Sequence, residues 1–251
     1  MPASDRTYPS VWARPRRKER STLTREQIVT QAIELLDGEG IEALSMRKLA
    51  ARLGVGATSL YWHVANRDEL IELVVDEVYG ELDLPDAAVA GTRIDVAEWR
   101  AATRRYAHSI RATVLRHPWL VSVVEHLVTA YLGPNLTKVT ERLLALFEAA
   151  GFEQLREAER AVSVLSSYVL GVATAEAAWR NWMARRGQTE QEWMSAAKAV
   201  ADTTTEGHER VKKVVAEYTT FDYADPQKAM DEDFDYGLDV MLDGLQARLA
   251  R

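Results

Sequence analysis

The sequence predicts an all-α protein with a small N-terminal helix-turn-helix domain and a larger C-terminal helical domain. Apolar residues recur at helical spacing through almost every segment, and no run alternates as a strand would. Glycine and proline punctuate the chain at places that suit helix ends. A length of 251 residues also suits a small domain joined to a larger one.

The first helix is expected to open within the stretch LTREQI. Thr24 can cap it together with Gln27, three residues on, in the reciprocal arrangement known as a capping box. Gly38 and Gly40 then end the apolar stripe, as glycines commonly do at the C-terminus of a helix.

Three more helices are expected in this part of the chain. A second helix is expected from Ser45, and a turn between Gly54 and Gly56 leads to a brief third helix at about 58–63. A fourth helix begins after Asn66, which can cap it with the glutamate three residues on, and continues to about residue 82.

The rest of the chain is expected to be helical as well. Residues 83–93 are rich in proline, glycine and small side chains, and they are interpreted as a linker. Beyond them, Gly and His-Pro or Gly-Pro breaks separate helices expected near 95–115, 119–130, 135–150, 154–184, 189–203, 207–218 and 227–249.

Composition narrows the classes of protein. The chain has no cysteine, which excludes disulfides, thiolate zinc sites and cysteine nucleophiles. Its first twenty residues are basic without an apolar core, so they do not form a secretory signal, and no apolar run is expected to reach the ~18 residues of a membrane span. We therefore expect a soluble cytoplasmic protein with no membrane partner.

Charge is distributed unevenly along the chain. Residues 1–67 carry eleven Lys and Arg against seven Asp and Glu, a net charge of +4, which leaves −11 for the rest of a chain whose total is −7. A basic N-terminal part on an acidic body indicates that this end meets a polyanion such as DNA.

A helix, a glycine turn and a second short helix form a helix-turn-helix, whose second helix enters the major groove of DNA by its N-terminal residues. Here those residues are Ala57, Thr58 and Ser59, which are small enough to approach base edges and thymine methyl groups. The alternative is an amphipathic three-helix subdomain that binds no nucleic acid.

Larger side chains around this helix suit the sugar-phosphate backbone. Tyr61 can reach phosphates through its hydroxyl and His63 through a ring N–H, while Trp62 lies between the two faces. Arg47 and Arg67 are spaced to clamp phosphates on either side.

A basic segment precedes the first helix. A flexible arm of this kind can enter an adjacent minor groove, where the negative potential of DNA is focused. A disordered, solubilising tail is the alternative. The residues assigned to the arm's DNA contact are Arg14, Arg16, Arg17 and Lys18.

Residues 23–70 run LTREQIVTQAIELLDGEGIEALSMRKLAARLGVGATSLYWHVANRDEL. This stretch resembles the DNA-binding domain of the TetR family of transcriptional repressors, and LYWHV is similar to the tetracycline-repressor branch. Ala57 replaces the polar residue that contacts bases in that branch, so we expect a different operator. The resemblance implies DNA contacts for Ser45, Arg47, Thr58, Ser59, Tyr61, Trp62, His63 and Arg67.

The same resemblance implies a double-stranded DNA operator and three parts of the chain. These are a flexible basic arm at 1–22, a helix-turn-helix domain at 23–70, and a ligand-binding and dimerisation domain at 71–251. Long amphipathic helices in the last part suit a four-helix bundle between two copies of the chain.

Pocket candidates are amphipathic side chains concentrated between residues 106 and 182, because aromatic walls with a few polar groups are typical of sites for drug-sized molecules. They are Tyr106, His108, Trp119, His126, Thr129, Tyr131, Tyr168, Trp179, Asn181 and Trp182. The segment HLVT at 126–129 looks like one that binds magnesium-tetracycline in the tetracycline repressors, but the remaining ligands of that site lack counterparts. A planar or polyketide-like inducer is therefore favoured.

The acidic and histidine clusters of the sequence do not form a recognisable enzyme site. Neither the pair at 125–126 nor the acidic run at 231–233 has a further ligand at helical spacing, so no metal, cofactor or catalytic residue is expected. The run DEDFDY is interpreted as the capped, solvated start of the last helix. The expected function is a ligand-released homodimeric repressor on a palindromic operator, with an exporter gene as a candidate target. The alternative is a helical small-molecule-binding or protein-interaction module without sequence-specific DNA binding.

Overall fold

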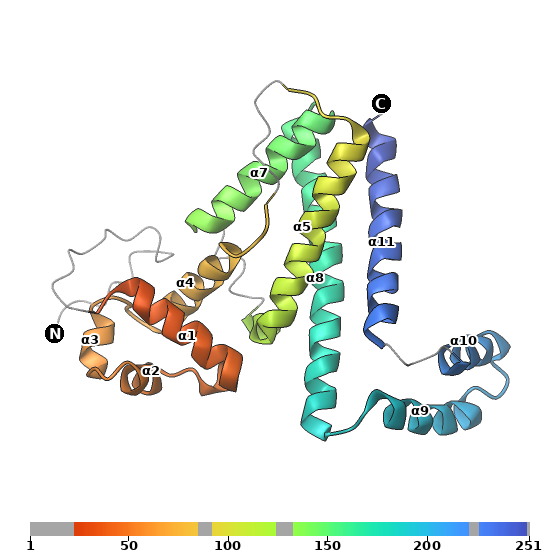
Figure 1. The fold of residues 1–251 in the computed structure, drawn as a ribbon, viewed down its shortest axis with the longest axis horizontal. Coiled ribbons are helices and arrows are strands. Elements are labelled where there is room, and N and C mark those ends of the chain that lie inside the picture. The colour runs from red at the N-terminus through yellow and green to blue at the C-terminus, as the bar shows by residue number, and fades with distance from the viewer. Residues whose placement is uncertain (1–22, 85–91, 124–132, 221–225, 250–251) are drawn as a thin grey trace.

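The computed structural model describes residues 23–84, 92–123, 133–220 and 226–249, which form helices and no strand. A head of short helices packs beside a body of long ones, and a helical hairpin, α9 and α10, projects away from the body (Figure 1). The elements are α1 (Arg25–Glu39), η2 (Ile41–Ala43), α2 (Met46–Arg52), α3 (Ala57–Tyr61), α4 (Arg67–Tyr79), α5 (Val96–Arg116), η3 (Pro118–Val123), α7 (Pro134–Ala150), α8 (Leu155–Arg186), α9 (Glu190–Thr204), α10 (Glu209–Thr220) and α11 (Pro226–Leu249).

Local signals account for the starts of the head helices. The Thr24 hydroxyl accepts the backbone N–H of Gln27 at 3.2 Å, and the Gln27 side chain accepts the N–H of Thr24 at 2.9 Å, which confirms the capping box. Gly40 ends α1 with a φ of 79°, a conformation that favours glycine.

Helix α4 begins as predicted and ends earlier. The Asn66 side chain caps it by accepting the N–H of Glu69 at 2.8 Å, but the Glu69 carboxylate accepts the N–H of Ala65 rather than that of Asn66. The helix ends at Tyr79 instead of about residue 82, because Gly80 follows and its N–H closes the last turn on the Asp76 and Glu77 carbonyls.

The buried residues form two apolar cores. The head core contains the inner sides of α1 to α4, and it continues along α4 to Val78, so the expected domain boundary at 70/71 falls inside α4. Trp119 and Val123 of η3 also belong to the head core, although η3 follows a body helix. Tyr79, Leu120 and Leu136 contact both cores and join them.

The body is built around α5 and α8, with α7 and α11 packed against them. Helix α8 has the length and hydropathy to cross a membrane, in contrast to the expectation that no run would, but Leu165, Val169 and Ala173 lie fully buried in the body core. Packing within the body therefore explains its apolar side.

Helix α7 receives its N-terminal cap from another part of the chain. The Asp76 carboxylate of α4 accepts the backbone N–H groups of Asn135, at 3.1 Å, and Leu136, at 3.0 Å. Burial raises the pKa of Asp76 above its usual value, although these hydrogen bonds act in the opposite direction. A side chain at Gly133 would collide with the Asp76 carboxylate, so this close approach requires glycine.

The helix predicted at 119–130 differs where the structure describes it. Residues 118–123 form a 3₁₀-helix, which His117 separates from α5 with a φ of −117° and a ψ of 67°. Proline at 118 disfavours a helical His117, which explains the break. Residues 124–130, and most of the predicted linker at 83–93, lie outside the described residues.

Candidate functional site

Helix α3 presents aromatic side chains to solvent. Leu60 is fully buried and anchors the helix in the head, whereas Tyr61 is 52% exposed and Trp62 is 64% exposed. Thr58 is exposed at the start of the helix, while Ala57 and Ser59 are half-buried. Neighbouring exposed aromatic side chains such as these are typical of a surface that binds another molecule.

Arg47 in the first turn of α2 is exposed beside this surface and has no ion-pair partner among the described residues. Its neighbours differ. Lys48 pairs with Glu39 of α1, and Arg52 lies 3.8 Å from carboxylates of Glu34 and Glu39. Arg47 is thus the cation of α2 that remains available for an external anion.

Two side chains that were predicted to contact phosphates, His63 and Arg67, are packed within the head. His63 is only 9% exposed, so little of its imidazole reaches the surface of the head, and its expected phosphate contact stays a prediction. The reason for its burial is that α3 ends at Tyr61, and the chain turns so that the N–H groups of His63 and Val64 both bond the Leu60 carbonyl. The His63 carbonyl accepts the Arg25 guanidinium at 3.3 Å.

Arg67 is also occupied within the head. Its Nε and one terminal nitrogen donate to the carbonyls of Leu44 and Ile41, each at 3.2 Å, and thereby tie the start of α4 to η2. The Ser45 hydroxyl caps α2 by accepting the N–H of Lys48 at 3.2 Å. These contacts hold the shape of the head, and the phosphate contacts expected of Arg67 and Ser45 stay predictions.

Those predicted pocket residues that the structure describes lie in different parts of the molecule. Tyr106 is buried in the body core, Trp119 lies in the head core, and His108 faces Asp235 of α11 at 2.9 Å. Tyr168 donates its hydroxyl to the Phe234 carbonyl at 2.8 Å. His126, Thr129 and Tyr131, like the arm residues Arg14, Arg16, Arg17 and Lys18, lie outside the described residues.

The tryptophans of α8 form a separate cluster at its C-terminal end. Trp179 and Trp182 stack with ring centroids 5.4 Å apart, and Trp193 of α9 packs edge-on against Trp179 at 4.7 Å. Asn181 is half-buried beside them. These residues attach α9 to α8 and do not line the described apolar pocket of the body.

That pocket has a volume of about 290 Å³ and lies between α4, α5, η3 and α8. Three hydroxyl side chains, Tyr79, Thr113 and Thr174, are set among apolar ones, and no charged side chain belongs to its described wall. A Cβ added at Gly171 would meet no atom within 4 Å. The lining residues are Val75, Val78, Tyr79, Leu82, Ile110, Thr113, Val114, Leu120, Leu170, Gly171 and Thr174.

Sequence reasoning missed this pocket because it relied on clusters of aromatic side chains with a few hydrogen-bonding groups. Valine, leucine and threonine at helical spacing look the same whether they fill a core or line a cavity. The glycine inside α8 was the available signal, since an interior helical glycine costs stability and calls for a packing or functional reason.

A second hollow is an open groove of about 920 Å³ between α8 and α11. Val164 on α8 and Tyr236 and Val240 on α11 line it, and Tyr236 is 75% exposed. These helices are the ones for which the sequence predicts contact with a second copy.

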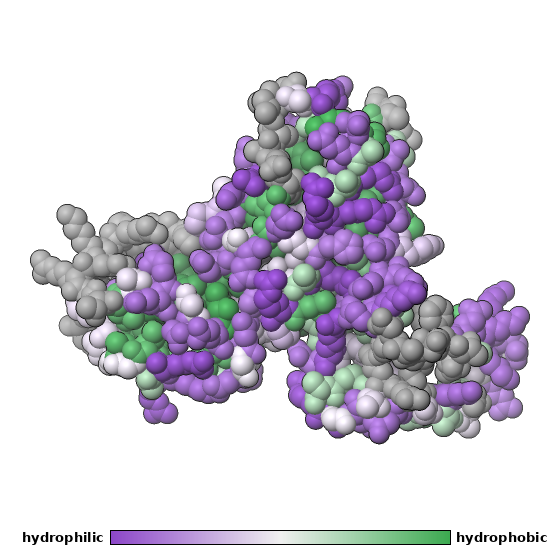
Figure 2. All heavy atoms as spheres, in the orientation of Figure 1, coloured by the Kyte–Doolittle hydropathy of each residue, from purple (hydrophilic) through white to green (hydrophobic). Residues whose placement is uncertain are grey.

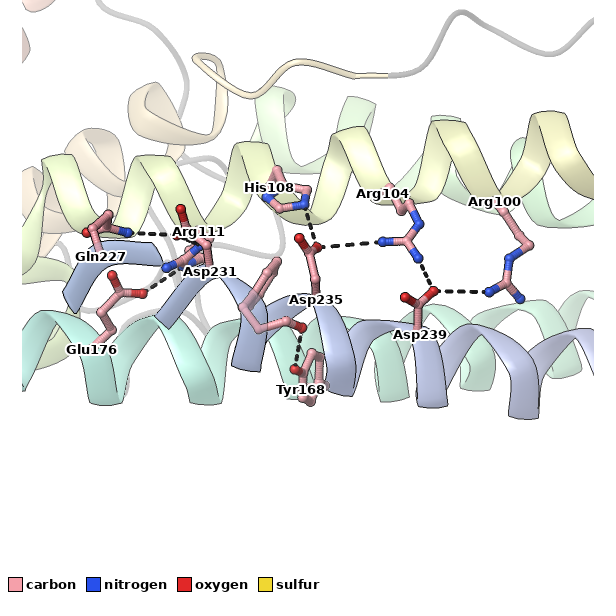
Figure 3. Close-up of polar contacts among 11 residues, drawn as sticks. Arg100, Arg104, His108, Arg111, Tyr168, Glu176, Gln227, Asp231, Asp235 and Asp239 are labelled. Carbon is pink, nitrogen blue, oxygen red and sulfur yellow. Dashed lines mark hydrogen bonds and ion pairs between the residues drawn. The ribbon is translucent and has the colours of Figure 1, made fainter. Parts of the chain in front are cut away.

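A seam of charged side chains joins α5 to α11 (Figure 3). Arg100 lies 3.2 Å from Asp239, Arg104 pairs with Asp235 and Asp239, and hydrophilic residues cover α5 and α11 on the face seen in Figure 2. The interpretation of DEDFDY as a solvated helix start holds only in part: α11 begins at Pro226, Asp231 and Asp235 face α5, and Glu232 and Asp233 are exposed. The two matching series are Arg100, Arg104, His108 and Arg111 on α5, and Asp231, Asp235, Asp239 and Asp243 on α11.

The buried end of the seam is Arg111. Its side chain donates to Glu176 of α8 and to Asp231, both at 2.7 Å, and its guanidinium lies 4.9 Å from the Phe234 ring centroid. Burial acts to lower the pKa of Arg111, but the two carboxylates outweigh it and raise that pKa. Burial acts to raise the pKa of Asp231, but hydrogen bonds from Gln227 and Arg111 outweigh it and lower that pKa.

Comparison with known proteins agrees with this architecture. Residues 28–74 match the family described as bacterial regulatory proteins, tetR family, and residues 95–249 match the tetracyclin repressor-like C-terminal domain. An HTH-type transcriptional repressor of Streptomyces coeruleorubidus, DrrR1, is 32% identical over 254 aligned positions, which cover 98% of this chain and 87% of the relative.

Two further relatives have the same character. An HTH-type transcriptional regulator of Saccharopolyspora erythraea is 39% identical over 174 residues, which cover 68% of this chain and 70% of that protein. The structure of the TetR family protein ActR of Streptomyces coelicolor in complex with actinorhodin has a TM-score of 0.69 and 29% identity, over 90% of this chain and 97% of ActR. The chain therefore belongs to the TetR family of transcriptional repressors, which are DNA-binding regulators and not enzymes.

Proposed function

We propose that this protein is a ligand-responsive repressor that binds a palindromic operator as a homodimer and leaves it when a small polyketide-like molecule binds the body. The observation that carries the proposal is the place of the apolar pocket: α4 forms one of its walls and also part of the head core. A molecule that shifts α4 therefore shifts α3, and so changes the affinity for DNA.

In the DNA-bound state, α3 lies in the major groove. Thr58 and Ser59 approach base edges, Tyr61 and Trp62 contact the sugar-phosphate backbone, and Arg47 pairs with a phosphate. Two copies of this surface meet successive major grooves about 34–36 Å apart, which is why we expect a palindromic operator.

The second copy packs on the groove between α8 and α11. Val164 and Val240 are each about half exposed there, together with Tyr236, and a four-helix bundle between two copies would bury them. A symmetric dimer also places the two heads on the same side, as a palindromic site requires.

The ligand is expected to be neutral and largely apolar, with hydrogen-bonding oxygens. The described wall offers hydroxyl groups and no imidazole or carboxylate, which disfavours a magnesium-tetracycline complex, since hard cations need oxygen ligands of higher charge. The ActR relative was crystallised with actinorhodin, which supports a polyketide-like class. An exporter gene remains a hypothesis for the target, and we expect the protein to act in the cytoplasm.

Selection of random DNA duplexes by the purified protein, with competitor DNA near physiological salt, tests this function. We expect a recovered palindrome, and a replacement of both Tyr61 and Trp62 by Ala should lower affinity for it by roughly tenfold or more. Val200→Ala, which removes an exposed apolar side chain of α9, is the matched control. Failure of a folded dimer to enrich any sequence would favour the alternative, a helical binding module without sequence-specific DNA recognition.

A further inference from the structure

We propose that His117 and Trp119 form a joint that transmits occupancy of the apolar pocket to the DNA-binding head. The inference rests on the proposed function and names its positioning residues. His117 is 3% exposed, with Nδ1 lying 2.7 Å from an Asp37 carboxylate oxygen and Nε2 lying 3.1 Å from a Glu81 carboxylate oxygen. The Trp119 indole N–H donates to the same Asp37 oxygen at 2.7 Å.

The joint connects three parts of the chain. Asp37 lies in the last turns of α1 and belongs to the head, Glu81 follows the end of α4, and His117 ends α5 of the body. A carboxylate accepts and does not donate, so both contacts of His117 are hydrogen bonds only when both ring nitrogens carry a proton. With either ring nitrogen protonated, the ring lies between the carboxylates of Asp37 and Glu81 and donates to at least one of them.

The short helix η3, which carries Trp119 and directly follows His117, also forms a wall of the pocket. Trp119 and Val123 of η3 pack in the head core, whereas Leu120 of η3 lines the pocket and contacts both cores. Successive residues of a 3₁₀-helix point about 120° apart, so one turn of η3 can face the head and the pocket at once. Across the pocket, Tyr79 and Leu82 of its wall flank Glu81.

A ligand that fills the pocket and presses on Leu120 moves this wall. Any displacement of η3 relative to the end of α4 changes the spacing from His117 to Glu81 or from Trp119 to Asp37. Hydrogen bonds weaken steeply beyond ~3.2 Å or when they are misaligned. A small shift of η3 therefore weakens the contacts that fix the orientation of the head relative to the body. The joint is therefore a two-state element that both pocket and head bias, as coupling between sites requires.

The test measures head spacing in the dimer without any ligand. The chain has no cysteine, so a nitroxide on Glu42→Cys in each head gives one spin-pair distance by pulsed electron resonance. Gly171→Leu serves as the probe of pocket occupancy, because a side chain there enters open space. We expect Gly171→Leu to shift or broaden the distance distribution in the otherwise unchanged protein.

Variants of the joint show whether it carries that shift. Trp119→Phe keeps an aromatic ring in the head core and removes only the indole donor, and His117→Gln cannot bridge both carboxylates. We expect either variant to broaden the distribution alone and to remove the further effect of Gly171→Leu. Arg116→Gln removes a 56%-exposed partner of the same Glu81 and should leave the response intact.

Operator affinity supplies the second readout. The ratio of affinities with Gly and with Leu at position 171 should exceed about tenfold with an intact joint and fall to roughly threefold or less in Trp119→Phe. A response equal in Trp119→Phe and in the protein with an intact joint would overturn the joint while leaving the repressor function standing. Absence of operator selection by the unaltered protein would instead overturn the function itself.

Discussion

The two sides of α5 differ in how they are held. On one side, Arg100, Arg104 and Arg111 pair with carboxylates of α11 and α8 (Figure 3). On the other side, Ile110 and Thr113 line a neutral pocket that they share with α4 and η3. The charged side has ion pairs along α5 that are lost if α11 slides, whereas the pocket side has a cavity lined mainly by apolar side chains, with the polar contacts of His117 and Trp119 at one end of α5.

This difference indicates which wall of the body is fixed and which can adapt. Moving α11 would separate the buried Arg111 from Asp231 and would also break the ion pairs of Arg100 and Arg104 with α11, which is costly where the charges are buried. Moving η3 or the end of α4 exchanges apolar contacts of similar strength and changes the hydrogen bonds of His117 and Trp119. We therefore expect ligand to act on the α4 and η3 side, where the head is attached.

The largest effect is expected from Arg111→Met on the charged side. Glu176, 5% exposed as a side chain, would lose its buried partner and keep Arg180 at 2.6 Å, so we expect a loss of about 1–3 kcal/mol of unfolding free energy in urea titrations. Arg100→Met is the control: its partners Asp239 and Asp243 are largely solvated, so its cost should stay below about 1 kcal/mol. Equal stability of Arg111→Met and the unaltered protein would contradict the fixed wall.

Gly171→Leu should alter the pocket side without harming the fold. The added side chain occupies ligand space, so we expect binding of actinorhodin to weaken at least about tenfold, with unfolding free energy equal or higher because an interior helical glycine is replaced. Calorimetric titration measures the first and urea unfolding the second.

Gly171→Ala is the matched control, since one methyl group leaves most of the space open. Equal binding by Gly171→Leu and the unaltered protein would place the ligand elsewhere. Absence of actinorhodin binding by the unaltered protein would contradict a polyketide-like ligand.

Thr174→Val tests whether a ligand in the pocket forms a hydrogen bond with the Thr174 hydroxyl. The replacement keeps the shape and removes a hydroxyl, so a ligand oxygen bonded to it would lose about 0.5–1.5 kcal/mol, or roughly three- to tenfold in affinity. Stability should change little. An unchanged affinity would mean that the ligand bonds to another hydroxyl, for which Thr113→Val is the matching variant.

The smallest effect is expected from Asp231→Asn at the charged side. The folded-state pKa of Asp231 is lowered, so the carboxylate stabilises the fold above its unfolded pKa of about 3.9, and that contribution is lost as pH falls through the folded pKa. Asp231 is nearly half exposed, so the difference in unfolding free energy should be under about 1 kcal/mol at pH 7. Urea titrations should show the difference vanishing in acid; a difference that grows in acid would contradict the assigned ion pair.

The sequence alone determined most helices and the family. Caps at Thr24 and Asn66, positive-φ glycines such as Gly40, and proline breaks act over three or four residues, so their effect can be predicted without knowing the fold. The family follows from residues 23–70 for the same reason, because its signature lies in one continuous stretch of chain.

The charged seam between α5 and α11 could have been predicted from the sequence, but its acidic half was interpreted differently. The basic series on α5 and the acidic series on α11 recur every three or four residues, and this periodicity marks matching faces. The orientations of His63 and Arg67 could not be predicted from the sequence, since they depend on where α3 ends and on which carbonyls lie across the head.

Only the tertiary structure decided the pocket, the joint and the cap of α7. Thr113 and Thr174 meet across the pocket from separate helices, His117 meets Asp37 across 80 positions of chain, and Asp76 caps a helix that begins almost sixty residues later. Such contacts form because burying apolar surface brings distant helices together. Once packed, a buried donor or acceptor must find whichever partner the packing supplies.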